Sequence, residues 1–552
     1  MLKDRIASVL KQAAVDAQQQ GLIPPVTLPE VTVEHPQNPA HGDYACSLPL
    51  KIARAARMSP MDIAKAMANL MAPIPEIGTI DVAAPGFINL TLKNSWIKQQ
   101  VELMIEMGDD YGSISLGQGS RVQVEFVSVN PTGPLHMGHG RGAVLGSTMA
   151  SILSAAGYQV EREYYLNDAG VQIDVFRHSL VAYYRQALGL PGEVPPDGYL
   201  GDYMIDLARE IVAEYSDRFA DLSHEEAAIQ LGQIGFDKMV EAIKQDLALL
   251  GVEFDTWFSE KSLYQGSQYE DTMSLLNQNG YIAEREGATW FASSALGEDK
   301  DNVLIRSNGT PTYFASDIAY HRNKFCERRF DRVIDIWGAD HQGHVPRMKA
   351  AMSALGIDPD RLEIIITQMV TLKRGGEEVR ISKRSGDIVT LNEVIAEVGR
   401  DACRYFFLAR SADSQMEFDL ELAKKQSTEN PVYYIQYAHA RAASIFRLAE
   451  EKCIDYSSGD ITLLTAEQEL VLIRKMLEFP EIIEVAANSL EPNFLPYYAQ
   501  DLATAFHNFY EKCRVVSGDE GLTMARLKLV RATKTLLART LRLMGMAAPE
   551  KM

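Results

Sequence analysis

The stretch 121–139, RVQVEFVSVNPTGPLHMGH, decides how this chain folds. Residues 121–129 are predicted to form an apolar strand, 130–135 a turn, and Gly140–Ala156 a helix that ends at Gly157. The motif His136-Met137-Gly138-His139 therefore lies at a helix N-terminus, where unpaired N–H groups and the positive end of the helix dipole attract phosphate. Because glycine lets a ligand approach the backbone, the turn suits a nucleotide. Taken alone, the two histidines could also be ordinary turn or core residues.

Length and composition limit the class of protein. A chain of 552 residues needs two to four domains, and its 46% hydrophobic and 23% charged residues are typical of globular proteins. The sequence contains no apolar run of about twenty residues, so no membrane span is predicted. Residues 1–20 form an amphipathic pattern without the apolar core of a signal peptide, so we expect a cytoplasmic protein with no membrane partner.

Charge is distributed unevenly. The net charge is −20, which by itself argues against nucleic-acid binding. Residues 512–552, however, contain nine Lys and Arg against three Asp and Glu. An acidic protein with a local basic segment suits selective RNA binding.

The five cysteines are scattered and odd in number: Cys46, Cys326, Cys403, Cys453 and Cys513. None forms a CxxC pair or a Cys/His cluster with zinc spacing. We therefore expect buried, reduced thiols and neither a structural zinc nor another bound metal.

The pattern along the chain divides it into three domains. Residues 1–95 are expected to form a small α+β unit. Residues 96–412 alternate strands and helices, which predicts a Rossmann-like parallel-sheet domain, with a helix-rich insertion at about 190–300. Strands are predicted at VQVEFVSV, QVEREYYL, RVIDIWGA and RLEIIITQM. After about Asp413 the strands stop, so 413–552 is predicted to be an all-α bundle.

Two further motifs support nucleotide chemistry. GADHQGH, 338–344, follows the predicted strand RVIDIW, and ligands of doubly wound sheets bind where such strands end. Asp340 could alternatively be a helix N-cap. ISKRSG, 381–386, is either a solvated basic turn or a Lys-Arg pair for nucleotidyl transfer, in which cations stabilise the charge growing on pyrophosphate.

These motifs resemble those of class I aminoacyl-tRNA synthetases, and the sequence around them resembles the arginyl-tRNA synthetase family. The blocks occur in the order of that family, and HGDYACSLPL and APGFINL resemble its N-terminal tRNA-binding domain. The main blocks are VEFVSVNPTGPLHMGHGRGAVLG, REYYLNDAGVQI, YFASDIAYHRNK, GADHQGHVPRM, ISKRSGDIVTL and the run DACRYFFLARSADSQMEFDLELAKKQSTENPVYYIQYAHAR. The insertion at 190–300 matches least specifically.

The resemblance implies an ATP site. HMGH stands where the superfamily has His-Ile-Gly-His, and RISKR stands where it has Lys-Met-Ser-Lys-Ser, so Arg380 and Arg384 depart from the pattern. The catalytic residues implied are His136, His139, Lys383 and Arg384. The ATP-binding residues implied are Gly138, Gly338, Asp340, His344, Met369 and Val370.

The resemblance also implies an arginine site. Its members are Glu125, Asn130, His136, Tyr313, Asp317 and His341, the last at a position where many relatives carry Gln. A guanidinium has five fixed donors that pair with carboxylates and planar acceptors, so two acidic residues suit it. Glu125 and Asp317 could instead form structural ion pairs.

For RNA, the implied contacts are Phe87 and Asn89 in the N-terminal unit and Tyr433 and Tyr437 in the bundle. Tyr433 and Tyr437 are spaced i, i+4, so they share a helix face on which bases could stack, although such a stripe can also be core. The resemblance implies that ATP, with Mg²⁺ as its substrate complex, arginine and tRNA(Arg) are the partners of a monomer, and that activation needs bound tRNA.

Two other functions remain open from the sequence. One is another class I synthetase, such as the cysteine enzyme, and the missing zinc ligands argue against it. The other is a catalytically inactive relative that only binds RNA.

Overall fold

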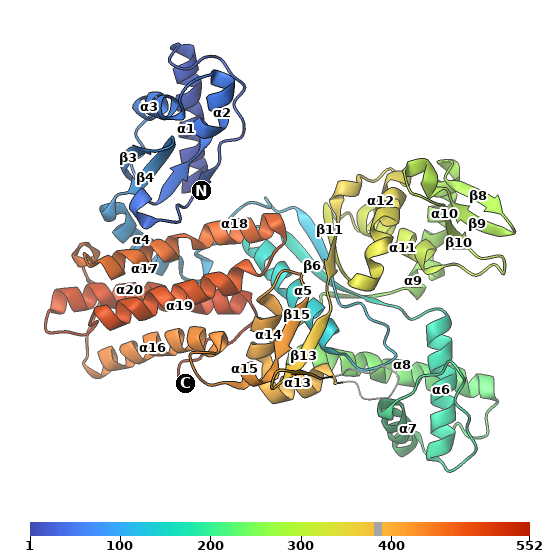
Figure 1. Cartoon of the computed structure of the whole chain (residues 1–552). Helices are drawn as coiled ribbons and strands as arrows, with labels where there is room; N and C mark the ends of the chain where they lie inside the picture. The colour runs from blue at the N-terminus through green and yellow to red at the C-terminus, as the bar shows by residue number, and fades with distance from the viewer. Residues whose placement is uncertain (380–388) are drawn as a thin grey trace.

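Five parallel strands form the central sheet of the computed structural model, which describes residues 1–379 and 389–552 (Figure 1). Their order is β12-β11-β5-β6-β7. The strands are β5 (Arg121–Glu125), β6 (Gln159–Leu166), β7 (Thr256–Ser259), β11 (Arg332–Gly338) and β12 (Leu362–Thr367). The chain builds β5 to β7 toward one edge and then adds β11 and β12 on the other side of β5. The strand order therefore reverses between β5 and β11, where a ligand is expected at the carboxyl ends.

The first predicted strand is shorter than expected. It was predicted to run to Val129, but β5 ends at Glu125 because Val127 (φ 69°) and Ser128 (φ 43°) adopt left-handed backbone conformations. The helix that follows, α5 (Met137–Ala155), begins three residues earlier than predicted because His136 caps it.

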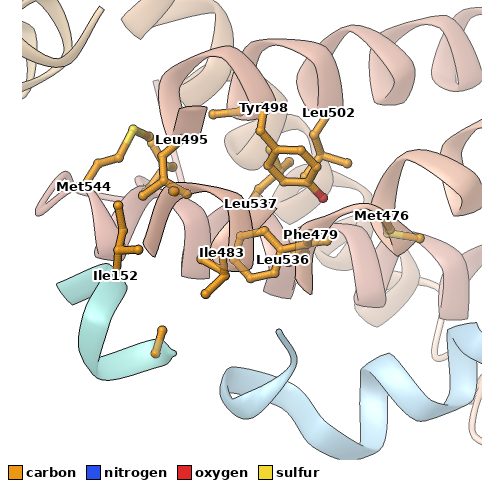
Figure 2. Packing of buried hydrophobic residues seen from close by; sticks show 14 of the residues in the cluster. Ile152, Met476, Phe479, Ile483, Leu495, Tyr498, Leu502, Leu536, Leu537 and Met544 are labelled. Atoms are coloured by element: carbon orange, nitrogen blue, oxygen red, sulfur yellow. The ribbon is translucent and has the colours of Figure 1, made fainter. Parts of the chain in front are cut away.

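Helix α5 is buried along almost its whole length. Gly146 lies against Phe126, and a Cβ built on this glycine would come within 2.1 Å of the ring. On the other side, Ile152 shares one hydrophobic cluster with Leu495 and Met544 of the C-terminal bundle (Figure 2). The helix that carries the histidine motif is thus packed between the sheet and the bundle.

The N-terminal unit has the predicted α+β form and stands apart from the sheet (Figure 1). Its sheet has the order β1-β2-β4-β3. The elements are α1 (Leu2–Gln19), β1 (Val33–Glu34), β2 (Tyr44–Cys46), α2 (Leu48–Ala56), α3 (Pro60–Leu70), β3 (Ile77–Ala83), β4 (Phe87–Leu92) and the connecting helix α4 (Asn94–Met107).

The stretch 190–300 contains three strands that the sequence did not predict: β7, β8 (Ile282–Arg285) and β9 (Ala288–Phe291). β7 lies inside it yet pairs with β6 in the central sheet. Its four residues, TWFS, are too few to show a period. Around it lie the helices α6 (Val171–Ala187), α7 (Asp202–Tyr215), α8 (His224–Leu249), α9 (Lys261–Gln265) and α10 (Gln268–Gln278).

A small antiparallel sheet of order β10-β9-β8 follows. Its strands are β8 (Ile282–Arg285), β9 (Ala288–Phe291) and β10 (Asn302–Ile305). Helix α11 (Tyr313–Arg322) then continues into the π-helical turn η4 (Asn323–Glu327) before β11, and α12 (Val345–Ala354) lies between β11 and β12.

The expectation that strands stop after Asp413 was wrong. β15 (Met416–Asp419) pairs in parallel with β13 (Val370–Arg374), which also pairs with β14 (Glu377–Glu378). β15 is only four residues long, and its partner is remote in sequence. The helices α13 (Leu391–Val398) and α14 (Arg400–Leu408) lie between β14 and β15 in the chain, and α15 (Leu420–Lys424) follows β15.

The remaining helices form the predicted bundle (Figure 1). They are α16 (Pro431–Glu451), α17 (Glu467–Leu477), α18 (Phe479–Ser489), α19 (Phe494–Lys512) and α20 (Glu520–Leu543). Several basic side chains of α20 pair with acidic side chains of the protein. Lys528 pairs with Glu102 at 2.6 Å, and Arg542 pairs with Asp109. Part of the basic segment 512–552 therefore attaches the bundle to α4 and the residues after it.

The cysteine expectation was partly wrong, since Cys46, Cys403 and Cys513 are buried but Cys326 and Cys453 are exposed; all five are free thiols. Within residues 1–379 and 389–552, no group of three His, Cys, Asp or Glu side chains could hold a metal ion. Across the same residues, no helix is long and apolar enough to cross a membrane.

The contact between Gly146 and Phe126 predicts a stability effect. Gly146→Ala should lower the free energy of unfolding by about 1–3 kcal/mol, because the added methyl overpacks the ring and shifts α5. Gly142→Ala on the same helix is the matched control, since nothing lies within 4 Å of its Cβ position. The control should gain up to about 1 kcal/mol from helix propensity. Thermal unfolding of both variants checks this, and equal midpoints would contradict it.

Candidate active site

The N-terminus of α5 holds the two histidines as the sequence predicted. The His136 ring accepts a hydrogen bond from the Gly138 N–H at 3.2 Å, and the His136 N–H donates to His139 Nδ1 at 3.3 Å. The two rings stack with centroids 3.5 Å apart. The imidazoles and the first N–H groups of the helix therefore lie together near the carboxyl end of β5.

The link between β5 and this motif is strained. Val127 is β-branched and sits at φ 69°, a conformation that costs about 1–3 kcal/mol. Two contacts from β6 hold the link, since Tyr164 donates its hydroxyl to the Val129 carbonyl at 2.8 Å and the Tyr165 N–H donates to Ser128 Oγ at 3.1 Å. The strain turns the chain across the sheet edge and sets where the turn 130–135 begins.

The second motif lies across the switch point. β11 ends at Gly338, and Ala339–His344 forms a short 3₁₀ helix, η5. Asp340 makes no capping hydrogen bond there, so the alternative interpretation of it as an N-cap is wrong. Its side chain is 82% exposed and lies 3.5 Å from His341 Nε2. Burial and the neighbouring Arg347 lower the pKa of His344 to about 4.

Glu125 forms the ion pair that the alternative interpretation allowed. It is the last residue of β5 and is 7% exposed. Its carboxylate accepts from Lys324 Nζ at 2.6 Å and from the Tyr320 hydroxyl at 2.8 Å. Burial raises the pKa of Glu125, and the Lys324 ammonium opposes that shift.

Asp317 differs from Glu125 in having no partner. Among the described residues, none donates a hydrogen bond or forms an ion pair with its carboxylate. Burial raises the pKa of Asp317 to about 6, with Glu125 adding to the shift and His321 opposing it. A cation brought to Asp317 would therefore stabilise its charged form.

Glu260 is a site residue that sequence reasoning missed. It directly follows β7, is 5% exposed, and lies close enough to Asp317 for their charges to interact. Burial raises its pKa to about 7 and the Asp317 charge adds to this, although hydrogen bonds with Ser316 and Tyr165 oppose the shift. Its only sequence signal was its place after β7, a strand that was itself not predicted.

The other residues predicted to hold the amino acid lie around these carboxylates. Tyr313 opens α11 one turn before Asp317 and is 47% exposed, and its hydroxyl interacts with the Glu260 charge. Asn130 donates to Gln172 of α6. His341 is near enough to influence the charge of Asp317. We call Glu125, Glu260 and Asp317 the acidic cluster.

The predicted nucleotide residues Met369 and Val370 are tied to α5 by a buried arginine. Met369 is 75% exposed, and Val370 opens β13. Arg141, which is 0% exposed, donates to the Gln368 carbonyl at 2.8 Å and to the Ser414 carbonyl at 2.9 Å. The histidine motif and the Met369 strand are therefore held in fixed relation.

Comparison with known proteins identifies the family. Residues 100–415 match the class I (R) tRNA synthetase catalytic domain, 1–92 the arginyl tRNA synthetase N-terminal domain, and 435–552 the DALR anticodon binding domain. The chain is 58% identical over 551 residues to the arginine–tRNA ligase of Dehalococcoides mccartyi, covering 100% of this chain and 99% of that protein. The chain belongs to the arginyl-tRNA synthetase family.

Further relatives of this synthetase agree. The arginine–tRNA ligase of Carboxydothermus hydrogenoformans is 48% identical and covers 99% of the chain and 98% of its own length. A crystal structure described as a putative arginyl-tRNA synthetase from Campylobacter jejuni shares 36% identity with a TM-score of 0.77, covering 84% of this chain and 100% of that one. Arginyl-tRNA synthetase from Thermus thermophilus, at 23% identity and TM-score 0.79 over 100% of both chains, shows the shared fold.

Two predicted catalytic residues of the synthetase, Lys383 and Arg384, lie outside the described residues, as does Arg380. Their roles stay predictions from the sequence.

The aromatic residues of α16 do share a face. Tyr433 and Tyr437 stack with ring centroids 6.0 Å apart, and Arg441 lies 4.6 Å from the centre of the Tyr437 ring. Both tyrosines are half-buried, so each keeps some accessible surface. In the N-terminal unit, Phe87 is half-buried but Asn89 is only 6% exposed, which leaves Asn89 little surface for direct contact.

The raised pKa of Glu260 predicts a pH-dependent stability cost. Folding raises the pKa from 4.5 to about 7, so the ionised carboxylate destabilises the synthetase. That cost is absent below the unfolded-state pKa, grows as pH rises, and is complete above the folded-state pKa. Glu260→Gln should therefore raise stability at about pH 8, by up to about 3 kcal/mol, and give no gain at about pH 4.

Thermal unfolding at both pH values measures this effect. Glu253→Gln, which changes an exposed carboxylate just before β7, is the control and should show no such gain. A loss of stability in Glu260→Gln at about pH 8 would mean that Glu260 has a cationic partner, contrary to this structure.

Proposed function

We propose that this chain is an arginine–tRNA ligase and that the acidic cluster binds the substrate guanidinium. The observation that carries this proposal is the pair Asp317 and Glu260. Both are carboxylates with pKa values raised by burial, and they lie near the switch point where a class I domain binds its ligands. Perturbed titratable groups that gather at such an edge are typical of a substrate site.

The chemistry follows from the reaction of the family. The arginine carboxylate attacks the α-phosphorus of ATP, pyrophosphate leaves, and arginyl-adenylate forms. A hydroxyl of the 3′-terminal ribose of tRNA(Arg), the 2′-OH by resemblance, then attacks the adenylate carbonyl, and AMP leaves. No protein nucleophile takes part, so the protein acts by positioning and by electrostatic stabilisation.

The location of each residue indicates which part of ATP it would contact. His136, His139 and the first N–H groups of α5, with Gly138, would contact ATP phosphates, and Mg²⁺ enters with ATP as part of the substrate. The remaining ATP contacts would come from Gly338, Asp340, His344, Met369 and Val370. Lys383 and Arg384 would stabilise the charge that grows on pyrophosphate during attack.

The arginine contacts would come from both sides of the switch point. Asp317 and Glu260 would pair with the guanidinium, and the Tyr313 side chain would contact the same group. Glu125, Asn130 and His341 would complete the set with His136. A lysine ammonium could not satisfy the same planar acceptors, and an unpaired buried carboxylate penalises the wrong substrate.

The tRNA contacts would come from Tyr433 and Tyr437 in the bundle and from Phe87 in the N-terminal unit. Asn89, which lies on the same strand as Phe87, would act indirectly through the sheet. The protein is expected to be a cytoplasmic monomer. A related ligase for another amino acid and a catalytically inactive RNA-binding relative are the competing functions. Pyrophosphate exchange measured with each of the twenty amino acids, with and without total tRNA, separates these three functions. Only this proposal predicts that arginine, and no other amino acid, supports exchange.

Asp317→Asn tests the guanidinium contact. The variant should raise the KM for arginine and narrow the preference for arginine over neutral citrulline, because a charge-assisted bond contributes about 1.5–3 kcal/mol. Asn keeps the shape of the side chain, so thermal stability should be equal or higher. A less stable enzyme with unchanged selectivity would remove Asp317 from the site.

Lys383→Ala tests the basic loop. The ammonium would meet charge that appears only during the reaction, so kcat for arginine activation should fall by about 10²-fold or more while the KM for arginine changes little. Pre-steady-state adenylate formation measures the step. A raised arginine KM with unchanged kcat would show instead that the loop binds substrate.

A further inference from the structure

One face of α11 and η4 carries a row of polar side chains onto the central sheet. Tyr320, His321, Lys324 and Arg328 follow one another at helical spacing and lie over four carboxylates of β5, β6 and β11. These carboxylates are Glu125, Glu161, Glu163 and Asp335. Lys324, Glu163 and Asp335 are 0% exposed, so this is a buried charge network and not a surface pattern.

Lys324 occupies the centre of the network. Its ammonium lies 2.6 Å from Glu125 and 2.8 Å from Asp335, and 4.2 Å from the centre of the Tyr320 ring. Among the described residues it is the one cation within ion-pair distance of Glu125. Arg328, by contrast, pairs with Glu161 at 2.6 Å and with Glu163, and does not reach Glu125.

The contacts on Glu125 are one-sided. Both the Lys324 ammonium and the Tyr320 hydroxyl bind the same oxygen, Oε2. No described residue donates a hydrogen bond to Oε1. The carboxylate is thus held at one oxygen from beneath, and the other is left for a ligand at the carboxyl edge of β5.

The electrostatics make Lys324 necessary for this arrangement. Burial raises the pKa of Glu125, and the charges of Asp335 and Glu163 add to that shift, so without a cation the carboxyl would tend to hold its proton. Burial alone would also raise the pKa of Asp335, but Lys324 and His321 outweigh it and hold that pKa low. The groups that face Glu125 are Tyr320, Lys324, Asp335, Glu163, Tyr165 and Asp317.

We propose that Lys324 is a positioning residue for the amino-acid substrate, whose ammonium keeps Glu125 ionised and turned so that Oε1 faces the cationic group of arginine. This inference rests on the proposed function, in which Glu125 contacts arginine. A purely structural Lys324 would stabilise the fold without affecting how arginine binding depends on pH.

The experiment uses the full-length enzyme with tRNA and measures the arginine KM by pyrophosphate exchange. Lys324→Met retains the length of the side chain and removes its charge, but it leaves the buried Asp335 with His321 as its remaining ion-pair partner, which can unfold the protein. The double variant Lys324→Met/Asp335→Asn removes both charges and keeps the test valid. In either variant the KM for arginine should rise about tenfold or more at about pH 6.5 and recover toward the wild-type value at about pH 8.5.

The pH dependence follows from Glu125. When Lys324 is lost, more of the Glu125 carboxyl is protonated at low pH, and a neutral carboxyl binds a cation poorly. Raising the pH restores the carboxylate and therefore the affinity, so the KM of these variants should fall more steeply between about pH 6.5 and 8.5 than the wild-type KM, whose own pH dependence comes from Asp317 and Glu260. Arg328→Met is the matched control, because it removes the other cation of the network without touching Glu125. It should lower the melting temperature and leave the pH profile of the KM unchanged.

Glu125→Gln separates the two proposals. If Glu125→Gln raises the arginine KM but the double variant keeps the wild-type KM and the wild-type pH profile, Lys324 has no positioning role and the proposed function stands. If Glu125→Gln leaves the KM unchanged, Glu125 does not contact arginine, and both its assigned role and the positioning proposal are overturned. If Arg328→Met reproduces the pH-dependent KM, the effect belongs to the network in general, which also overturns a specific role for Lys324.

Discussion

The site depends on one constraint. Beneath the carboxyl edge of the central sheet, buried carboxylates outnumber the cations that could pair with them. Glu125, Glu163 and Asp335 project from three neighbouring strands, and two cations, Lys324 and Arg328, meet them from α11 and its continuation. The π-helical turn η4 carries Lys324 and is followed directly by Arg328. Such turns are rare and occur often at functional sites, because they add a residue without ending the helix. Neighbouring Asp317 and Glu260 have no ion-pair partner among the described residues, so the sheet edge remains electronegative.

A second set of buried charges fixes the helix that carries the histidines. Arg404 is 1% exposed and donates to the Leu250 carbonyl at 3.0 Å and to Ser147 Oγ of α5 at 2.9 Å, and it also binds the Met544 carbonyl at the end of α20. Burial lowers the pKa of Arg404 to about 9. Its planar fork therefore joins the sheet domain, α8 and the bundle through neutral acceptors. Together with the apolar contact of Ile152, this makes α5 a rigid support shared by the catalytic and anticodon-binding parts (Figure 2).

Sequence reasoning recovered those features that are local or periodic. The HMGH motif after a strand and the i, i+4 spacing of Tyr433 and Tyr437 can both be recognised in a short window of sequence. The features that it missed depend on pairs remote in the chain. The Lys324–Glu125 pair spans 199 residues, and β15 finds β13 only through the folded sheet. Four-residue strands such as β7 are too short to show a hydrophobic period. Glu260 was missed because the strand that it follows, β7, was not predicted.

The same excess of carboxylates explains how a site can select a cation without a preformed counter-charge. Two ionised carboxylates close together in a region of low dielectric repel one another and hold protons tightly, so the empty site favours a neutral state. A planar guanidinium that meets both at once supplies the missing charge and several donors in fixed directions, and it gains more than a single ammonium could. Neutral analogues leave the carboxylates unpaired and gain nothing from them. In the proposed site, the unsatisfied charges of Asp317 and Glu260 would therefore be the source of discrimination, since the free energy released when a cation arrives is largest where the unliganded charges are least well satisfied.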